Sequence, residues 1–270
     1  MVSTHPSLAE AAGDRASDGV LSFSEYLALE AAREDGLTKG ERTRRRIKAA
    51  AARILETKGY HALQMADIAR TAGLSHGAVY KYFQNKRHVT LEVLSECVEW
   101  SIGLMLPDKL ESNAYERIYQ ATLKQVNLFV ANMGLTRCIR QLGDELPEFN
   151  ELVLRTNAEW CEMVARGFVK RWKPGRATIE LACDVAHVLG AMVDEVMYDI
   201  FVRRNPRLAH YGNDPERLAR MLSILWYRAA YGENPVSDRL DPEDSVLALT
   251  TTLDAFRLHP LAGTKLAGEE

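Results

Sequence analysis

Several features are missing from this 270-residue sequence, and each absence excludes a class of protein. No apolar run approaches the roughly 18 residues that a membrane-spanning helix needs, so we expect no membrane segment. The N-terminus lacks a basic segment followed by an apolar core, which indicates no secretory signal and makes the cytoplasm the expected location. The nucleophile elbow, the phosphate loop, the glycine pattern of dinucleotide-binding folds and the HExxH pattern are missing too, so we do not expect an enzyme.

Signals for disulfides and metal sites are also weak. The sequence contains four scattered cysteines, Cys97, Cys138, Cys161 and Cys183. None is close enough to another to form a CxxC pair, which is typical of reduced core residues. Three further residues have the spacing of one helix face: Glu180, Asp184 and His187. A solvated or interface cluster explains them better than a metal site, so we predict no metal and no cofactor.

The charge is distributed unevenly along the chain. The formal net charge is −3, but residues 39–88 contain 12 Lys and Arg against 3 acidic residues and so carry +9. Residues 1–38 carry −5, and the remainder carries −7. A compact basic segment inside an acidic protein predicts one polyanion-binding surface.

Apolar residues recur at helical spacing along most of the chain, and no segment shows convincing strand alternation, so the predicted fold class is all-α. Residues 1–20 are expected to form a mobile tail. Ser22 and Glu25 can form a capping box for a short helix over 23–35, ended by Gly36. Gly59 and Gly134 are among the predicted breaks. The other predicted helices cover residues 39–58, 65–72, 76–83, 86–106, 113–132, 135–143, 147–172, 176–203, 214–231 and 243–257.

Residues 63–83 have the physical properties of a helix-turn-helix. Gly73 permits the positive φ that the sharp turn requires. Ser75 can cap the second helix through its hydroxyl group. The side chains expected to face the core are Met65, Ile68, Ala69, Leu74, Val79 and Phe83.

The opposite face of the second helix fits a major groove. Gly77 and Ala78 are small enough for close approach, and His76 and Lys81 can donate hydrogen bonds to guanine or to phosphate. The N–H groups at the helix N-terminus add phosphate donors. Arg44, Arg45 and Arg46 lie near the start of the helix predicted over residues 39–58 and extend the positive surface. The candidate DNA-binding residues are Arg44, Arg45, Gln64, Ser75, His76, Gly77, Ala78, Tyr80, Lys81, Tyr82 and Lys86.

This segment resembles the N-terminal domain of the TetR family of regulators over about 50 of the 270 residues. The matching features are the Arg-rich helix, Gly59-Tyr60, Asp67-Ile68-Ala69, Gly73-Leu74-Ser75, Gly77-Ala78-Val79-Tyr80-Lys81-Tyr82-Phe83 and Lys86. One departure is Gln64, where the family usually has Ser or Thr as the cap of the first motif helix. Glutamine is a weaker cap, although its amide can still reach a phosphate.

We expect three parts: an N-terminal extension (1–38), a DNA-binding domain (39–88) and an effector-binding, dimerising domain (89–270). The resemblance implies the last two, whereas the extension is unusual for the family, which commonly starts near the Arg-rich helix. It implies a homodimer that pairs through helices near 176–203 and 214–231 and binds a palindromic operator in double-stranded DNA. Small or apolar residues on these helices fit such pairing, and they fit an intramolecular core as well. They are Ala182, Ala186, Gly190, Ala191, Val193, Leu218, Met221, Leu222, Leu225 and Trp226.

The resemblance also implies an effector pocket among the middle helices. The candidate lining residues are Trp100, Leu104, Met105, Tyr115, Tyr119, Phe129, Met133, Leu142, Trp160, Met163 and Phe168. Aromatic and Met residues at helical spacing are also typical of plain core. Taken together, they predict an apolar or amphipathic small-molecule ligand.

The sequence therefore predicts a repressor that a small ligand releases from its operator. The alternatives at this point are a ligand-independent regulator controlled by a protein partner, a motif that is only structural, and an activator instead of a repressor. The negative charge of the N-terminal extension argues against a DNA-binding arm. We expect its apolar side to pack on the protein and to brace or shield the DNA-binding domain.

Overall fold

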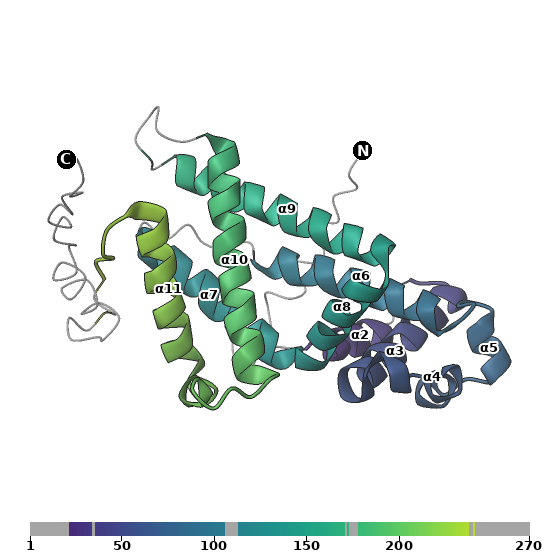
Figure 1. Cartoon of the computed structure of the whole chain (residues 1–270). Coiled ribbons are helices and arrows are strands. Elements are labelled where there is room, and N and C mark those ends of the chain that lie inside the picture. The colour runs from purple at the N-terminus through teal and green to yellow at the C-terminus, as the bar shows by residue number, and fades with distance from the viewer. Residues whose placement is uncertain are drawn as a thin grey trace, which may run out of the picture.

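The computed structural model describes residues 22–33, 36–105, 113–170, 172, 178–237 and 240. Every regular element within these residues is a helix (Figure 1), which confirms the predicted all-α class. The helices are α2 (Phe23–Ala32), α3 (Lys39–Ala62), α4 (Met65–Ala72), α5 (His76–Tyr80), α6 (Lys86–Met105), α7 (Ala114–Ala131), α8 (Met133–Glu145), α9 (Pro147–Val169), α10 (Ile179–Phe201), η1 (Ala209–Tyr211) and α11 (Pro215–Tyr231). The predicted tail over 1–20 and the predicted helix over 243–257 lie outside the described residues.

Two apolar clusters hold these helices together. The N-terminal cluster joins α2 through α6 to α8 and to the adjoining ends of α7 and α9. The C-terminal cluster joins the rest of α7 and α9 to α10 and α11. Figure 1 shows that α5 lies at one end of the molecule and α11 at the other. No helix within the described ranges is long and apolar enough to cross a membrane.

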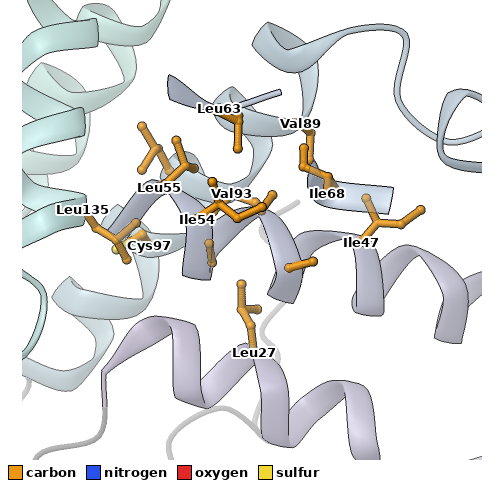
Figure 2. Packing of buried hydrophobic residues seen from close by; sticks show 14 of the residues in the cluster. Leu27, Ile47, Ile54, Leu55, Leu63, Ile68, Val89, Val93, Cys97 and Leu135 are labelled. Carbon is orange, nitrogen blue, oxygen red and sulfur yellow. The ribbon is translucent and has the colours of Figure 1, made fainter. Parts of the chain in front are cut away.

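The short helix α2 begins as the sequence predicts and packs on the protein. Ser22 Oγ accepts a hydrogen bond from the Glu25 N–H, and the Glu25 carboxylate accepts one from the Ser22 N–H, which completes a capping box. The rings of Phe23 and Tyr26 lie 5.3 and 5.5 Å from the Trp100 ring of α6. Leu27 points from α2 toward α3 (Figure 2). Burial raises the pKa of Tyr26 to about 12, and the Glu30 carboxylate adds to the rise.

The structure corrects the predicted end of α2 and confirms the predicted stop at Gly59. α2 ends at Ala32 with Arg33 in an extended conformation, so Gly36 is not its terminator. α3 continues past Gly59 to Ala62 through a kink in which Gly59 has φ 77° and ψ 174°. The regular helix that starts at Lys39 therefore stops at Gly59, as the sequence predicts, and the residues up to Ala62 form a second helical piece beyond the kink. Glycine accepts this positive φ because it has no Cβ to clash.

The sequence predicts a break between helices at Gly134, but this residue lies inside α8. The chain turns at Asn132, which separates α7 from α8. A Cβ placed on Gly134 would lie only 1.9 Å from the backbone oxygen of Glu56 in α3. The glycine is therefore required for close contact between α8 and α3. Leu135, the next residue of α8, lies close to Cys97 of α6 (Figure 2).

The cysteines behave as the sequence predicts for core residues. Cys97, Cys138 and Cys161 are buried, Cys183 is half-buried, and all four are free thiols. Burial raises the pKa of Cys97 to about 12. It also raises the pKa of Cys138, whose thiol contacts the Leu55 carbonyl oxygen at 3.6 Å. The thiols of Cys97 and Cys138 are therefore neutral packing groups at ordinary pH.

Candidate nucleic-acid interface

The turn between α4 and α5 has the geometry that the sequence predicts. Gly73 is left-handed, with φ 63° and ψ 40°, and the Leu74 N–H donates to the Ala69 carbonyl oxygen at 2.9 Å. Leu74 packs half-buried against the N-terminal cluster. Ser75 caps α5, since its Oγ accepts a hydrogen bond from the Ala78 N–H at 3.3 Å. These contacts fix the angle between the two helices of the motif.

The helix α5 presents a sharply two-sided surface. Val79 and the following Phe83 are fully buried. The residues on the outer side are exposed or half-buried: His76, Gly77, Ala78, Tyr80, Lys81 and Tyr82. The rings of His76 and Tyr80 meet edge-on, with 4.9 Å between their centroids. This outer face therefore presents two small residues, two aromatic rings, an imidazole and an ammonium group on one short helix and its final turn.

α5 is shorter than the predicted span of 76–83, because its last three residues form a turn. The Tyr82 N–H donates to the Val79 carbonyl oxygen three residues back, and the Phe83 N–H shares that oxygen. The Tyr82 carbonyl oxygen accepts a hydrogen bond from Arg44 Nη1 at 3.3 Å. The hydrogen bond from Arg44 of α3 thus satisfies a backbone carbonyl group at the end of the motif.

Gln64 occupies the N-cap position of α4, as predicted. Its side chain is exposed and makes no capping hydrogen bond to that helix. The amide group is therefore available at the end of α4. Lys86 is half-buried, and its Nζ lies 4.7 Å above the Tyr60 ring and 3.5 Å from the His61 carbonyl oxygen. The ammonium group of Lys86 is held near the protein by these two contacts.

The three consecutive arginines of α3 point to three different internal partners. Arg44 pairs with Glu92 of α6, Arg45 Nη1 lies 3.2 Å from the Glu30 carbonyl oxygen, and Arg46 Nη2 lies 2.5 Å from the Ala72 carbonyl oxygen. Arg45 also lies 3.4 Å from the Glu30 carboxylate. Their contact with DNA phosphate remains a prediction. The positive charge of this run is evident from the sequence, but no local pattern indicates that these side chains contact groups of the protein itself.

The candidate effector-binding residues divide between the two apolar clusters. Trp100, Leu104 and Leu142 belong to the N-terminal cluster, and Trp100 stacks against α2. A larger group belongs to the C-terminal cluster: Tyr115, Tyr119, Phe129, Met133, Trp160 and Phe168. Met105 and Met163 are half-buried and belong to neither cluster. The structure therefore does not bring the whole predicted set together.

The two helices predicted for dimerisation use much of their apolar surface within the chain. Four of the five small or apolar residues of α10 are buried: Ala182, Ala186, Gly190 and Val193. Gly190 lies against Trp160 of α9, since a Cβ there would sit 3.1 Å from that ring. Ala191 is exposed, and so are Leu181 and Val188, at 49% and 66%. In α11, Leu218, Leu222 and Trp226 are buried, while Met221 and Leu225 are half-buried.

Glu180, Asp184 and His187 share the exposed side of α10. Among the residues that the structure describes, no group of His, Cys, Asp or Glu has the arrangement of a metal site. His187 Nδ1 lies 3.4 Å from the amide nitrogen of Asn157 in α9. This contact joins the two helices at their surface.

Comparisons with known proteins agree with the geometry of the motif. Residues 47–93 match the family model described as bacterial regulatory proteins, tetR family. The HTH-type transcriptional regulator EthR of Mycolicibacterium smegmatis is 26% identical over 199 residues, which cover 70% of this chain and 87% of the relative.

Solved structures extend the likeness of fold to the helical C-terminal region. A transcriptional regulator from Rhodococcus sp. Rha1 has a TM-score of 0.58 at 17% identity and covers 71% of this chain and 97% of its own. A transcriptional regulator from Saccharomonospora viridis, solved in complex with choline, has a TM-score of 0.56 at 22% identity and covers 67% of this chain and 94% of its own.

Proposed function

Because this chain belongs to the TetR family of DNA-binding transcriptional regulators, we propose that it is a repressor released from its operator by a small apolar or amphipathic molecule. It is a regulator and not an enzyme. The observation that carries the proposal is the outer face of α5, where Gly77 and Lys81 are exposed beside a capped helix N-terminus. Such a face fits a major groove, with Lys81 donating to a base or a phosphate. Because its target is chromosomal DNA, the protein acts in the cytoplasm.

The proposed operator contacts are the outer residues of α5 with Gln64 and Lys86 beside them. The effect of Lys81→Ala on binding to the DNA upstream of the protein's own coding region tests this face. We expect weaker binding and a slope of log K against log salt that is shallower by about 0.9, because one phosphate contact is lost. Arg166→Ala, which removes an exposed cation on α9, is the matched control and should leave binding unchanged. Unchanged binding by Lys81→Ala would overturn the assignment of this face.

We propose that the protein is a homodimer that pairs through the outer side of α10 together with α11. Support comes from Leu181, Val188 and Ala191, which are exposed at helical spacing on α10. A dimer would present two α5 helices to successive major grooves of a palindromic operator. Val188→Glu should produce a monomer in light scattering at micromolar concentration. The matched control is Leu154→Glu, at an apolar residue of α9 that is 55% exposed.

We propose that the effector binds among the aromatic residues of the C-terminal cluster. Support comes from Tyr119, Phe129 and Trp160, which gather there from α7 and α9. The choline held by the regulator from Saccharomonospora viridis is an example of a small molecule bound within this fold. Native mass spectrometry of the purified protein tests the proposal. A retained small molecule that weakens operator binding supports it, whereas a ligand-free protein released only by another protein contradicts it.

A further inference from the structure

The guanidinium of Arg44 makes four contacts within the protein, although the side chain is 38% exposed. Its Nε donates to Glu92 Oε1 at 3.0 Å, and its Nη2 donates to the second oxygen of the same carboxylate. Its Nη1 donates to the Tyr82 carbonyl oxygen at 3.3 Å, and its Cζ lies 4.5 Å above the centre of the Phe83 ring. We call residues 76–83, which comprise α5 and the turn after it, the recognition segment. One side chain of α3 therefore joins the end of this segment to α6.

The acceptor of this pair is itself fixed in place. The Glu92 side chain is 23% exposed and also lies 3.8 Å from Lys48 Nζ and 4.0 Å from His88 Nε2. A carboxylate that accepts two parallel hydrogen bonds from a guanidinium has a defined orientation as well as a strong attraction. Lysine carries the same charge as arginine but cannot form this planar fork. The geometry therefore depends on the shape of arginine and not on its charge alone.

A second arginine makes the corresponding contact at the other motif helix. Arg46 Nη2 donates to the Ala72 carbonyl oxygen, which lies at the last residue of α4. Cationic side chains near helix C-termini satisfy carbonyl groups that lack a partner within the helix. α3 thus contacts the ends of α4 and of the recognition segment through side chains two residues apart.

We propose that Arg44 and Glu92 form a positioning pair that sets the orientation of α5, and that Arg44 contributes no phosphate contact. The proposal rests on DNA binding by the outer face of α5. It assigns to Arg44 a role different from the one its position in a basic run predicts. It also gives a role to Glu92, an acidic residue beside a surface that binds a polyanion.

Arg44→Lys and Glu92→Gln separate the two possible roles of Arg44 in a salt series of operator binding. A positioning role predicts that each variant loses about tenfold or more in affinity, while the slope of log K against log salt is unchanged. If Arg44 instead contacts a phosphate, neither variant should lose affinity in this way. Arg44→Lys would keep the charge and most of the affinity, and Glu92→Gln would bind more tightly because a nearby negative charge is gone.

Arg42→Gln is the matched control for loss of a cation from the same end of α3. Its side chain is exposed, and within the described part of the chain no hydrogen bond or ion pair involves its guanidinium. Hydrogen exchange of the amides of Tyr82 and Phe83 adds a measurement that needs no DNA. We expect faster exchange in Arg44→Gln and in Glu92→Gln, and unchanged exchange in Arg42→Gln.

The outcomes distinguish this proposal from the assignment of the DNA-binding face. Full affinity in Arg44→Lys, or tighter binding by Glu92→Gln, overturns the positioning pair while leaving the face intact. If Lys81→Ala binds as well as the parent, the face itself is wrong. In that case, hydrogen exchange of the Tyr82 and Phe83 amides tests the positioning pair, and unchanged exchange in Arg44→Gln overturns it.

Discussion

The N-terminal and C-terminal clusters use polar side chains in different ways. In the N-terminal cluster, charged and amide groups bond to helix ends: Arg44 to the Tyr82 carbonyl oxygen, Arg46 to that of Ala72, and Asn132 Oδ1 to the Phe23 N–H at 2.7 Å. Each of these bonds joins residues that are far apart in the sequence. The relative placement of α2, α3, α4 and the recognition segment is therefore fixed by directional contacts.

In the C-terminal cluster, aromatic rings from several helices pack against one another among aliphatic side chains. Trp226 meets Trp160 and Phe168, with centroids 6.1 and 5.9 Å apart, and Phe168 also packs against Trp172 and Tyr231. Ring packing tolerates a range of angles and separations. The indole N–H groups of Trp226 and Trp172 donate to backbone carbonyl oxygens, and Trp226 also meets two other rings while Trp172 meets one.

The difference fits the two tasks of the ligand-controlled regulator that we propose. A surface that reads DNA must hold its side chains at fixed distances, and directional bonds give that precision. A region that admits a ligand or changes its packing gains from contacts that can rearrange without leaving buried polar groups unpaired. The comparison predicts that removal of one directional contact lowers the free energy of unfolding strongly in the N-terminal cluster and only slightly in the C-terminal cluster.

The largest effect is expected at Gly134, where α8 contacts α3. Gly134→Ala should lower the free energy of unfolding by about 3 kcal/mol, because the added Cβ collides with the Glu56 backbone oxygen and the helices must separate. Urea unfolding at fixed protein concentration measures the change. Gly143→Ala on the same helix is the control. Its nearest atom would be 3.9 Å away, so we expect a gain of about 0.5 kcal/mol from helix propensity. Equal effects at the two glycines would show that the contact is not tight.

A smaller effect is expected at Asn132, which links α2 to the junction of α7 and α8. Its Oδ1 accepts from the Phe23 N–H, and its Nδ2 donates to the Leu128 carbonyl oxygen at 2.9 Å. Asn132→Ala should cost about 2 kcal/mol, since it leaves a buried N–H without an acceptor. Urea unfolding gives the cost, and hydrogen exchange at Phe23 shows whether α2 opens first. Asn127→Ala, at a half-buried position of α7, is the control and should cost much less.

The sequence predicted the motif at residue level because short-range signals determine it. The turn requires a left-handed residue, and Gly73 adopts this conformation without a steric clash. Ser75 lies one residue before the helix that it caps. Most helix positions also followed from apolar spacing. The partners of Arg44, Arg45 and Arg46 could not be predicted in this way. Glu92, Glu30 and Ala72 are distant in the sequence, and a run of arginines looks the same whether it faces DNA or the protein.

The same limit explains the error at Gly134 and the division of the candidate effector residues between two clusters. Glycine is common at helix ends, but it also occurs inside helices where a neighbouring helix comes close. For Gly134, only the position of α3 shows which of these two roles applies. Trp100 has the spacing of a middle-helix residue, yet the aromatic residues that stack on it come from α2. Both cases depend on contacts between segments that local patterns cannot pair.

The smallest effect is expected in the C-terminal cluster, at Trp226. Trp226→Phe removes the hydrogen bond from Nε1 to the Leu189 carbonyl oxygen, 3.3 Å long, and keeps an aromatic ring beside Trp160 and Phe168. We expect a cost of about 1 kcal/mol in urea unfolding, because the lost bond is replaced by ring packing that adjusts. Trp226→Ala, which also removes the ring, is the matched control and should cost several times more. If the phenylalanine and alanine variants cost the same, a directional bond dominates here too, and the contrast between the two clusters is lost.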